Sequence, residues 1–298
     1  MPSLPTLVFM AFFFLGSLVA MFQNGFMVTV LGREWARGRS LPTGDIIVTC
    51  LAASRFCLHG MSVLNNLLFV FGFCPQVNAF NIPWDFANTL TFWFTGWLAF
   101  FYCVKISSFS HPVFLWLKWR ISQSVPRLLL GSLVIAGVSV SSSIVGNSKL
   151  GPLIALQISS GNDTLADRVL VAHRLIFLPH LLLVLSVPFV LFLVSTLLLM
   201  FSLHRHLGRM KESRLGQRDP STQAHTMALK SLAFFLVFCT WYFLSIVIIL
   251  MKSINFQNLW HWVWEVVTYA GVCLHSSILI LSSPKLRKAL KMSLRKPC

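Results

Sequence analysis

The sequence predicts an all-α membrane protein made of a bundle of seven transmembrane helices. Apolar residues make up 56% of the 298 residues, whereas charged residues make up only 11%. An ordinary soluble domain has roughly 25% charged residues. The mean hydropathy of +0.76 shows the same bias. At about 20 apolar residues per span plus short loops, a chain of this length accommodates roughly seven helices.

Seven apolar segments are long enough to cross a bilayer, and we expect them to form one domain. The third segment ends at a Pro-containing break, where Lys105, Lys118 and Arg120 are typical of a span that meets its polar border. The expected spans lie near residues 6–30, 45–71, 84–107, 127–146, 176–203, 228–250 and 261–282, and residues 283–298 form a basic tail.

Basic residues fall in alternate connections, and this asymmetry predicts the orientation of the chain. Cytoplasmic loops carry an excess of Lys and Arg, so the N-terminus is predicted outside and the tail in the cytoplasm. The same pattern accounts for the net charge of +16 without a nucleic-acid partner. The basic residues of the first, third and fifth loops and the tail are Arg33, Arg37, Arg39, Lys118, Arg120, Arg205, Arg209, Lys211, Arg214, Arg218, Lys285, Arg287, Lys288, Lys291, Arg295 and Lys296, whereas the other loops hold only Lys149, Arg168, Arg174 and Lys252.

The loop between the fourth and fifth spans, from about 147 to 175, is predicted to lie outside. Asn162 begins an N-glycosylation acceptor, Asn162-Asp163-Thr164, in this loop. The loop contains no cysteine, so no disulfide can join it to the third span. The seven cysteines include no CxxC pair, and no His/Cys cluster has metal-ligand spacing. We therefore expect no metal and no cofactor. The first span lacks a basic leader, so we expect it to act as an uncleaved targeting signal.

Polar residues at membrane depth are candidates for function because they are costly to bury in lipid. In the first and seventh spans, Asn24 and His275 are single polar residues that serve either helix packing or chemistry. In the second span, Arg55 lies about ten residues from the border, too deep to reach the surface easily. It should face the bundle interior, either as a polar clasp between helices or as part of a switch. In the fifth span, Pro188 predicts a bend that is either architectural or a hinge.

The third and seventh spans carry polar residues near their outer ends, where a ligand could reach them. Trp84 and Asn88 are four residues apart on one helix face, and Thr91 extends that face. An aromatic wall beside an amide suits a small organic ligand, but interfacial Trp plus a helix-packing Asn is an alternative. Glu265 lies roughly one turn into the seventh span, either in a ligand site or hydrated near the border.

Several segments, spread over the chain in the right order, resemble the bitter taste receptors, the type 2 taste receptor family of G-protein-coupled receptors. FYCVKISSFSHPVFLWLKWRI resembles that family's third span and second cytoplasmic loop. The other similar segments are LAASR at 51–55, Pro188-Phe189 with SLHRHLGRM at 202–210, DPSTQAHTMALK at 219–230 and HSSILILSSPKLRKAL at 275–290. The chain departs from the family pattern at Thr89, at TGWLAF in the third span and at Ser282-Ser283-Pro284 before the tail.

The resemblance implies roles for individual residues. It implies an outer ligand site formed by Trp84, Asn88, Thr91, Tyr242, Glu265 and Thr268. It places the residues expected to act in activation and G-protein coupling mostly in the inner half, and these are Asn24, Arg55, Tyr102, Lys105, His111, Ser202, His206, His225, Lys230 and His275.

The function implied is that of a plasma-membrane receptor, not an enzyme. The resemblance implies small bitter compounds as ligands and a gustducin-like G protein as partner, with phospholipase and calcium signalling downstream. The basic inner loops favour acidic membrane lipids. A transporter or channel is the main alternative, but no inverted repeat is evident. Apart from Asp45 and Asp85 at the borders, Glu265 is the only acidic residue well inside a span. An intramembrane enzyme would need paired carboxylates, a metal cluster or a framed nucleophile, and the sequence shows none.

Overall fold

The computed structural model describes residues 3–38, 40–72, 74–107, 111–145, 163–213, 220–251 and 259–295. Within these ranges the chain forms eight α-helices and no β-strand. The helices are α1 (Leu4–Ala36), α2 (Thr43–Val70), α3 (Cys74–Ile106), α4 (Pro112–Val145), α6 (Asp163–Ser213), α7 (Pro220–Met251), α8 (Leu259–Ser282) and α9 (Pro284–Arg295).

Seven of the described helices, all except α9, are long and apolar enough to cross a membrane. A lipid interior offers no hydrogen-bond partners, so each spanning segment must satisfy its own backbone groups, which a helix does. The predicted fold class, an all-α bundle of seven membrane-spanning helices, is therefore confirmed. The side of the membrane on which each terminus lies stays a prediction.

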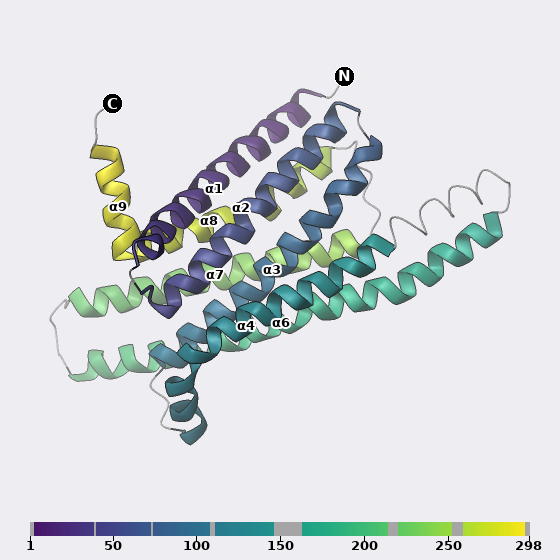
Figure 1. Cartoon of the computed structure of the whole chain (residues 1–298). Coiled ribbons are helices and arrows are strands. Elements are labelled where there is room, and N and C mark those ends of the chain that lie inside the picture. The colour runs from purple at the N-terminus through teal and green to yellow at the C-terminus, as the bar shows by residue number, and fades with distance from the viewer. Residues whose placement is uncertain are drawn as a thin grey trace.

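The helices run alternately up and down and give the bundle two faces (Figure 1). We call the face at which α1, α3, α6 and α8 begin the N-terminal face. The opposite face, where these helices end, is the C-terminal face. Helix α9 leaves the bundle there, directly after α8, and contacts α1 (Figure 1).

Many of the basic residues that the sequence pattern placed in loops or in the tail lie in helices. Arg33, for example, lies in the last turn of α1. Lys118 and Arg120 lie in the first turns of α4, which begins at Pro112. Proline suits a first helical position because its missing N–H would have no partner there. Arg205 belongs to α6, which continues without interruption through Pro188 to Ser213. Apolar length marks only the membrane-embedded part of a helix, and Lys and Arg are good helix formers beyond it.

Helix α3 is the most enclosed of the membrane-spanning helices. Its most apolar stretch is 67% buried, against 22% for that of α1. It packs against α2, α4 and α6. Side chains of α1 to α4, including Leu31, Leu51 and Leu98, form one apolar cluster. A second cluster is rich in aromatic rings and includes Phe13, Trp262 and Tyr269. The residues at the middle of α3 are thus held from several sides.

An ion-pair cluster joins α9 to the bundle at the C-terminal face. The Lys285 ammonium lies 3.2 Å from a carboxylate oxygen of Glu34 and 3.4 Å from one of Asp45. Partial burial lowers the pKa of Lys285, but the hydrogen bond to Glu34 and the nearby Asp45 outweigh it and raise the pKa above its ordinary 10.5. Lys285 therefore links the start of α9 to both α1 and α2.

Replacing Lys285 with glutamine is expected to destabilise the protein by at most about 1 kcal/mol, because the ammonium group is partly solvated. A raised pKa means that the ion pairs contribute fully below pH 10.5 and that this contribution is lost as the pH rises through the folded-state value. The melting temperatures of the parent and Lys285→Gln should thus differ at neutral pH and converge at high pH. Lys288→Gln, exposed on the same helix, is the control. A difference that persists at high pH would contradict the ion-pair origin.

Candidate functional site

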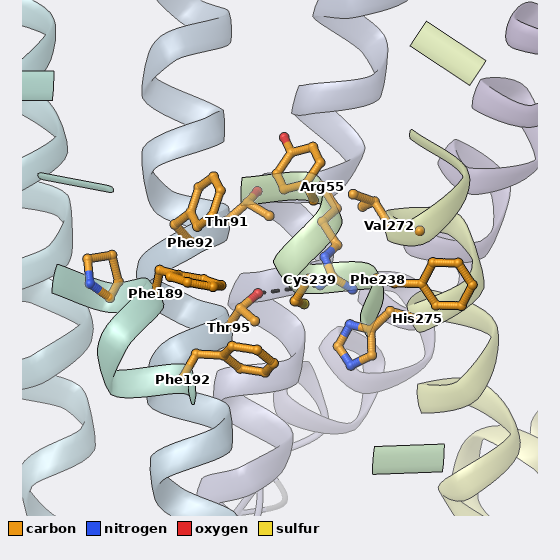
Figure 2. A pocket seen from close by; sticks show the side chains of 13 residues that line it. Arg55, Thr91, Phe92, Thr95, Phe189, Phe192, Phe238, Cys239, Val272 and His275 are labelled. Atoms are coloured by element: carbon orange, nitrogen blue, oxygen red, sulfur yellow. Dashed lines mark hydrogen bonds between the residues drawn. The ribbon is translucent and has the colours of Figure 1, made fainter. Parts of the chain in front are cut away.

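A small cavity lies in the middle of the bundle, between α2, α3, α6, α7 and α8 (Figure 2). Its volume of about 30 Å³ has room for roughly two water molecules. Apolar and aromatic side chains dominate its wall, and a few polar groups face it. The lining residues are Arg55, Thr91, Phe92, Thr95, Pro188, Phe189, Phe192, Phe238, Cys239, Tyr242, Gly271, Val272 and His275.

Arg55 is the centre of a polar network that joins four helices. Its side chain is 2% exposed and reaches from α2 toward α3 and α8 (Figure 2). It donates to the hydroxyl of Thr95 and to that of Ser276, each at 3.4 Å. The Ser276 hydroxyl donates in turn to the Asn24 side-chain oxygen at 3.1 Å, and the Asn24 amide donates to the backbone oxygen of Ala20 at 2.7 Å. The network therefore runs from α1 through α8 and α2 to α3.

A second buried hydrogen bond joins α3 to α7 beside the cavity. The Tyr242 hydroxyl donates to the Asn88 side-chain oxygen at 2.6 Å. One turn along α3, Thr91 donates to the Ser54 hydroxyl at 3.2 Å and to the backbone oxygen of Ala87 at 2.8 Å. The predicted ligand residues Asn88, Thr91 and Tyr242 are thus brought together. The side chains of Asn88 and Tyr242 bind each other, whereas the Thr91 hydroxyl binds Ser54 of α2 and its own helix backbone.

The other predicted ligand residues lie nearer the N-terminal face. The Trp84 indole donates to the Tyr269 hydroxyl at 2.7 Å and so joins α3 to α8. Glu265 and Thr268 precede Tyr269 on α8. One carboxylate oxygen of Glu265 and the Thr268 hydroxyl are buried, and neither has a hydrogen-bond partner among the described residues. These two oxygen atoms are free to accept or share hydrogen bonds with an incoming molecule.

Aromatic contacts hold the cavity wall on the α6 and α7 side. The rings of Phe189 and Phe243 stack with centroids 4.0 Å apart, and Phe92 stacks on Tyr242 at 5.3 Å. The His275 ring stacks on Phe235 at 3.5 Å. A wall of this kind accepts apolar surfaces of many shapes.

The remaining residues predicted for activation lie toward the C-terminal face, away from the cavity. The rings of His206 and His225 meet edge to face at 5.4 Å and join α6 to α7. The Lys105 ammonium donates to the backbone oxygen of Lys118 at 3.2 Å, and His111 accepts a hydrogen bond from the Val113 N–H at 3.3 Å. Among the others, Tyr102 is half-buried, Ser202 is buried and Lys230 is exposed.

The structure divides the predicted residues differently from the sequence pattern. Arg55 and His275, both predicted to act in activation, line the same cavity as Thr91 and Tyr242, which were predicted to bind ligand. Asn162 lies outside the described residues. Within the described ranges, no group of three or more His, Cys, Asp or Glu side chains is arranged to hold a metal ion.

Three residues near the site were not predicted from the sequence. Tyr269 could have been found, because it lies four residues after Glu265 on the same helix face. Ser276 could have been found beside His275, in a motif that the sequence already marked. His59, fully buried with its ring 5.2 Å from that of Tyr269, had no signal beyond being a polar residue in an apolar span.

Comparison with known proteins gives the same assignment along the whole chain. The family model described as Taste receptor protein (TAS2R) matches residues 1–297. Taste receptor type 2 member 62 of Pan paniscus is 58% identical over 300 residues, which cover 100% of this chain and 96% of that protein. Member 134 of Rattus norvegicus is 57% identical over 98% of this chain and 87% of its own length. Member 16 of Pan troglodytes is 41% identical, with 96% and 97% covered. The chain therefore belongs to the type 2 taste receptor family and is a multi-pass bitter taste receptor of the G-protein-coupled class.

Proposed function

We propose that this receptor binds small bitter compounds between α3, α7 and α8, toward the N-terminal face, and activates a gustducin-type G protein at the C-terminal face. In this proposal the N-terminal face is extracellular, which also places the predicted glycosylation site Asn162 outside the cell. One observation carries the proposal. Thr91 and Tyr242, predicted to bind ligand, share a cavity wall with Arg55 and His275, predicted to act in activation.

Ligand binding requires the site to open. Pockets for drug-sized molecules have volumes of about 300–1,000 Å³, whereas the cavity has about 30 Å³. The Tyr242 hydroxyl now binds Asn88, and the Trp84 indole binds Tyr269. A ligand that separates these pairs exposes their polar groups, and it can also use the unpartnered oxygen of Glu265. Such a ligand stabilises an open arrangement of α3, α7 and α8 over the compact one.

The same movement provides a route to the C-terminal face. Tyr242 and His225 lie on one helix, α7, and His225 contacts His206 of α6. Displacement of Tyr242 would tilt α7 and separate this histidine pair. A gap between α6 and α7 would admit an amphipathic helix, such as the C-terminal helix of a G-protein α subunit. The basic residues near this face would favour anionic lipid headgroups around it.

The test is calcium mobilisation in cells that express the receptor, with and without a gustducin-like α subunit, against a broad panel of bitter compounds. A response that requires the α subunit supports coupling through phospholipase and calcium. A response that is equal without it, in cells lacking related α subunits, contradicts the proposed partner.

Replacing Asn88 or Glu265 with alanine is expected to raise the half-maximal agonist concentration about tenfold for at least one agonist. A lost hydrogen bond to a buried polar group changes affinity by about 1.4 kcal/mol or more. Dose-response curves should be measured at matched surface expression. Ser124→Ala is the control, because Ser124 lies on α4 and, within the described part of the chain, donates only to the Arg120 backbone oxygen of its own helix. The pocket assignment is wrong if both variants reach the surface and respond normally to every agonist of the parent.

A further inference from the structure

The Arg55 guanidinium is a buried positive charge that has no acidic partner among the described residues. No ion pair within the described ranges joins it to a carboxylate, and its two hydrogen bonds go to neutral hydroxyl groups at the long distance of 3.4 Å. Its Nε atom is buried and has no hydrogen-bond partner among the described residues. A guanidinium has five N–H donors, and burying a charge is costly unless it is paired. The contacts of Arg55 therefore leave both a donor and a charge unmatched.

The cavity beside Arg55 holds a second unmatched group. His275 lines it from α8, and its Nδ1 atom is buried without a partner in the described part of the chain. Figure 2 shows Arg55 and His275 on the same side of the cavity, with Thr95 facing them from α3. Because the Thr95 oxygen accepts a hydrogen bond from Arg55, its own O–H remains available to donate. The Arg55 guanidinium and the Thr95 hydroxyl are therefore two donors that adjoin one space. The His275 Nδ1 becomes a third in the tautomer that carries its proton there.

The size and charge of this space define what fits it. About 30 Å³ is enough for a monatomic ion or a few light atoms, and far too small for an organic ligand. A cation would be repelled by Arg55. Water would accept hydrogen bonds from the donor groups. It would not neutralise the positive charge of Arg55, which is most costly at membrane depth.

We propose that the cavity holds one small monovalent inorganic anion of the size of chloride, bound by Arg55 with Thr95 and His275. The anion neutralises the guanidinium and links α2, α3 and α8. It therefore stabilises the compact arrangement of the bundle. This inference does not depend on the proposed agonist site or on the G protein.

The test uses the purified full-length receptor in detergent micelles, without agonist or G protein. Its melting temperature is measured while chloride replaces gluconate, an anion too large for the cavity, at constant sodium concentration. A ligand of the folded state at ten times its dissociation constant should raise the melting temperature by about 3 °C. The rise should saturate with chloride, and bromide should reproduce it.

Arg55→Gln should remove the chloride dependence, whereas Arg127→Gln, which changes an exposed arginine of α4, should retain it. If Arg55→Gln does not fold, the Thr95→Val variant should bind chloride more weakly than the parent. Chloride NMR line broadening by the parent, reversed by bromide and not by gluconate, would give direct support. A parent melting temperature that is equal in chloride and gluconate, or that follows ionic strength alone, would overturn the proposal and leave water as the occupant.

Discussion

Replacement of Gly96 by alanine is expected to destabilise the receptor by roughly 1–3 kcal/mol, a range typical of overpacked interiors. Gly96 lies at the middle of α3, where that helix meets α6. A Cβ atom added there would lie 2.9 Å from the backbone oxygen of Pro188. A backbone oxygen cannot move aside as the end of a flexible side chain can, so α3 and α6 must separate. The measurement is the melting temperature of the purified variant, together with its amount at the cell surface.

Gly137→Ala is the matched control for Gly96→Ala. Gly137 lies in α4, and an added Cβ would meet nothing within 4 Å. Alanine has the higher helix propensity by about 1 kcal/mol, so this variant should be as stable as the parent or slightly more stable. A Gly96→Ala variant with the melting temperature of Gly137→Ala would show that α3 and α6 do not approach as closely as the structure indicates.

Asn24→Ala is expected to reduce agonist potency about tenfold and to lower the melting temperature. Asn24 is fully buried and is the α1 end of the network that continues through Ser276 to Arg55. Removing its amide leaves a small void and deprives the Ser276 hydroxyl of one acceptor. The loss of such a buried contact costs about 1–3 kcal/mol, of which 1.4 kcal/mol corresponds to a factor of ten. Arg55 would then be held less firmly between α2, α3 and α8.

The Asn24 prediction is tested by calcium dose-response curves at equal surface expression. Thr29→Ala is the control on the same helix, because Thr29 is exposed and its hydroxyl donates to the Gly25 backbone oxygen of its own helix. Parent-like potency and stability in Asn24→Ala would mean that the network contributes neither to the resting structure nor to signalling.

The fold was largely predictable, because a long apolar segment directly indicates a helix that can cross a membrane. Each of the seven apolar segments corresponds to one helix that can span a bilayer. The positions of the helix ends were not predictable from hydropathy. Lys118 lies in α4 and Arg205 in α6, both beyond the expected spans, because the hydropathy signal stops at the membrane border and the helical hydrogen bonds do not. Helix α9 was also not predicted, because the basic tail contains no long apolar segment that would indicate a helix.

The candidate site was predictable in part. Spacing on a single helix identified the shared face of Trp84, Asn88 and Thr91, since side chains four residues apart lie one above the other. It could not identify that Asn88 binds Tyr242, because these residues are 154 positions apart and on different helices. The ligand and activation roles of the predicted residues stay predictions until the variants above are measured.

Seven spans, their order and their basic connections follow from the amino-acid pattern, because lipid permits a spanning segment few alternatives to a helix and charge concentrates at its ends. The partners of the polar side chains do not follow from it. Each of these helices carries apolar side chains on most of its faces. The pattern therefore does not indicate how a helix is rotated about its axis or how deep it lies in the bundle. Helix packing settles both, and it places Arg55 beside two hydroxyl groups and a small cavity instead of a carboxylate.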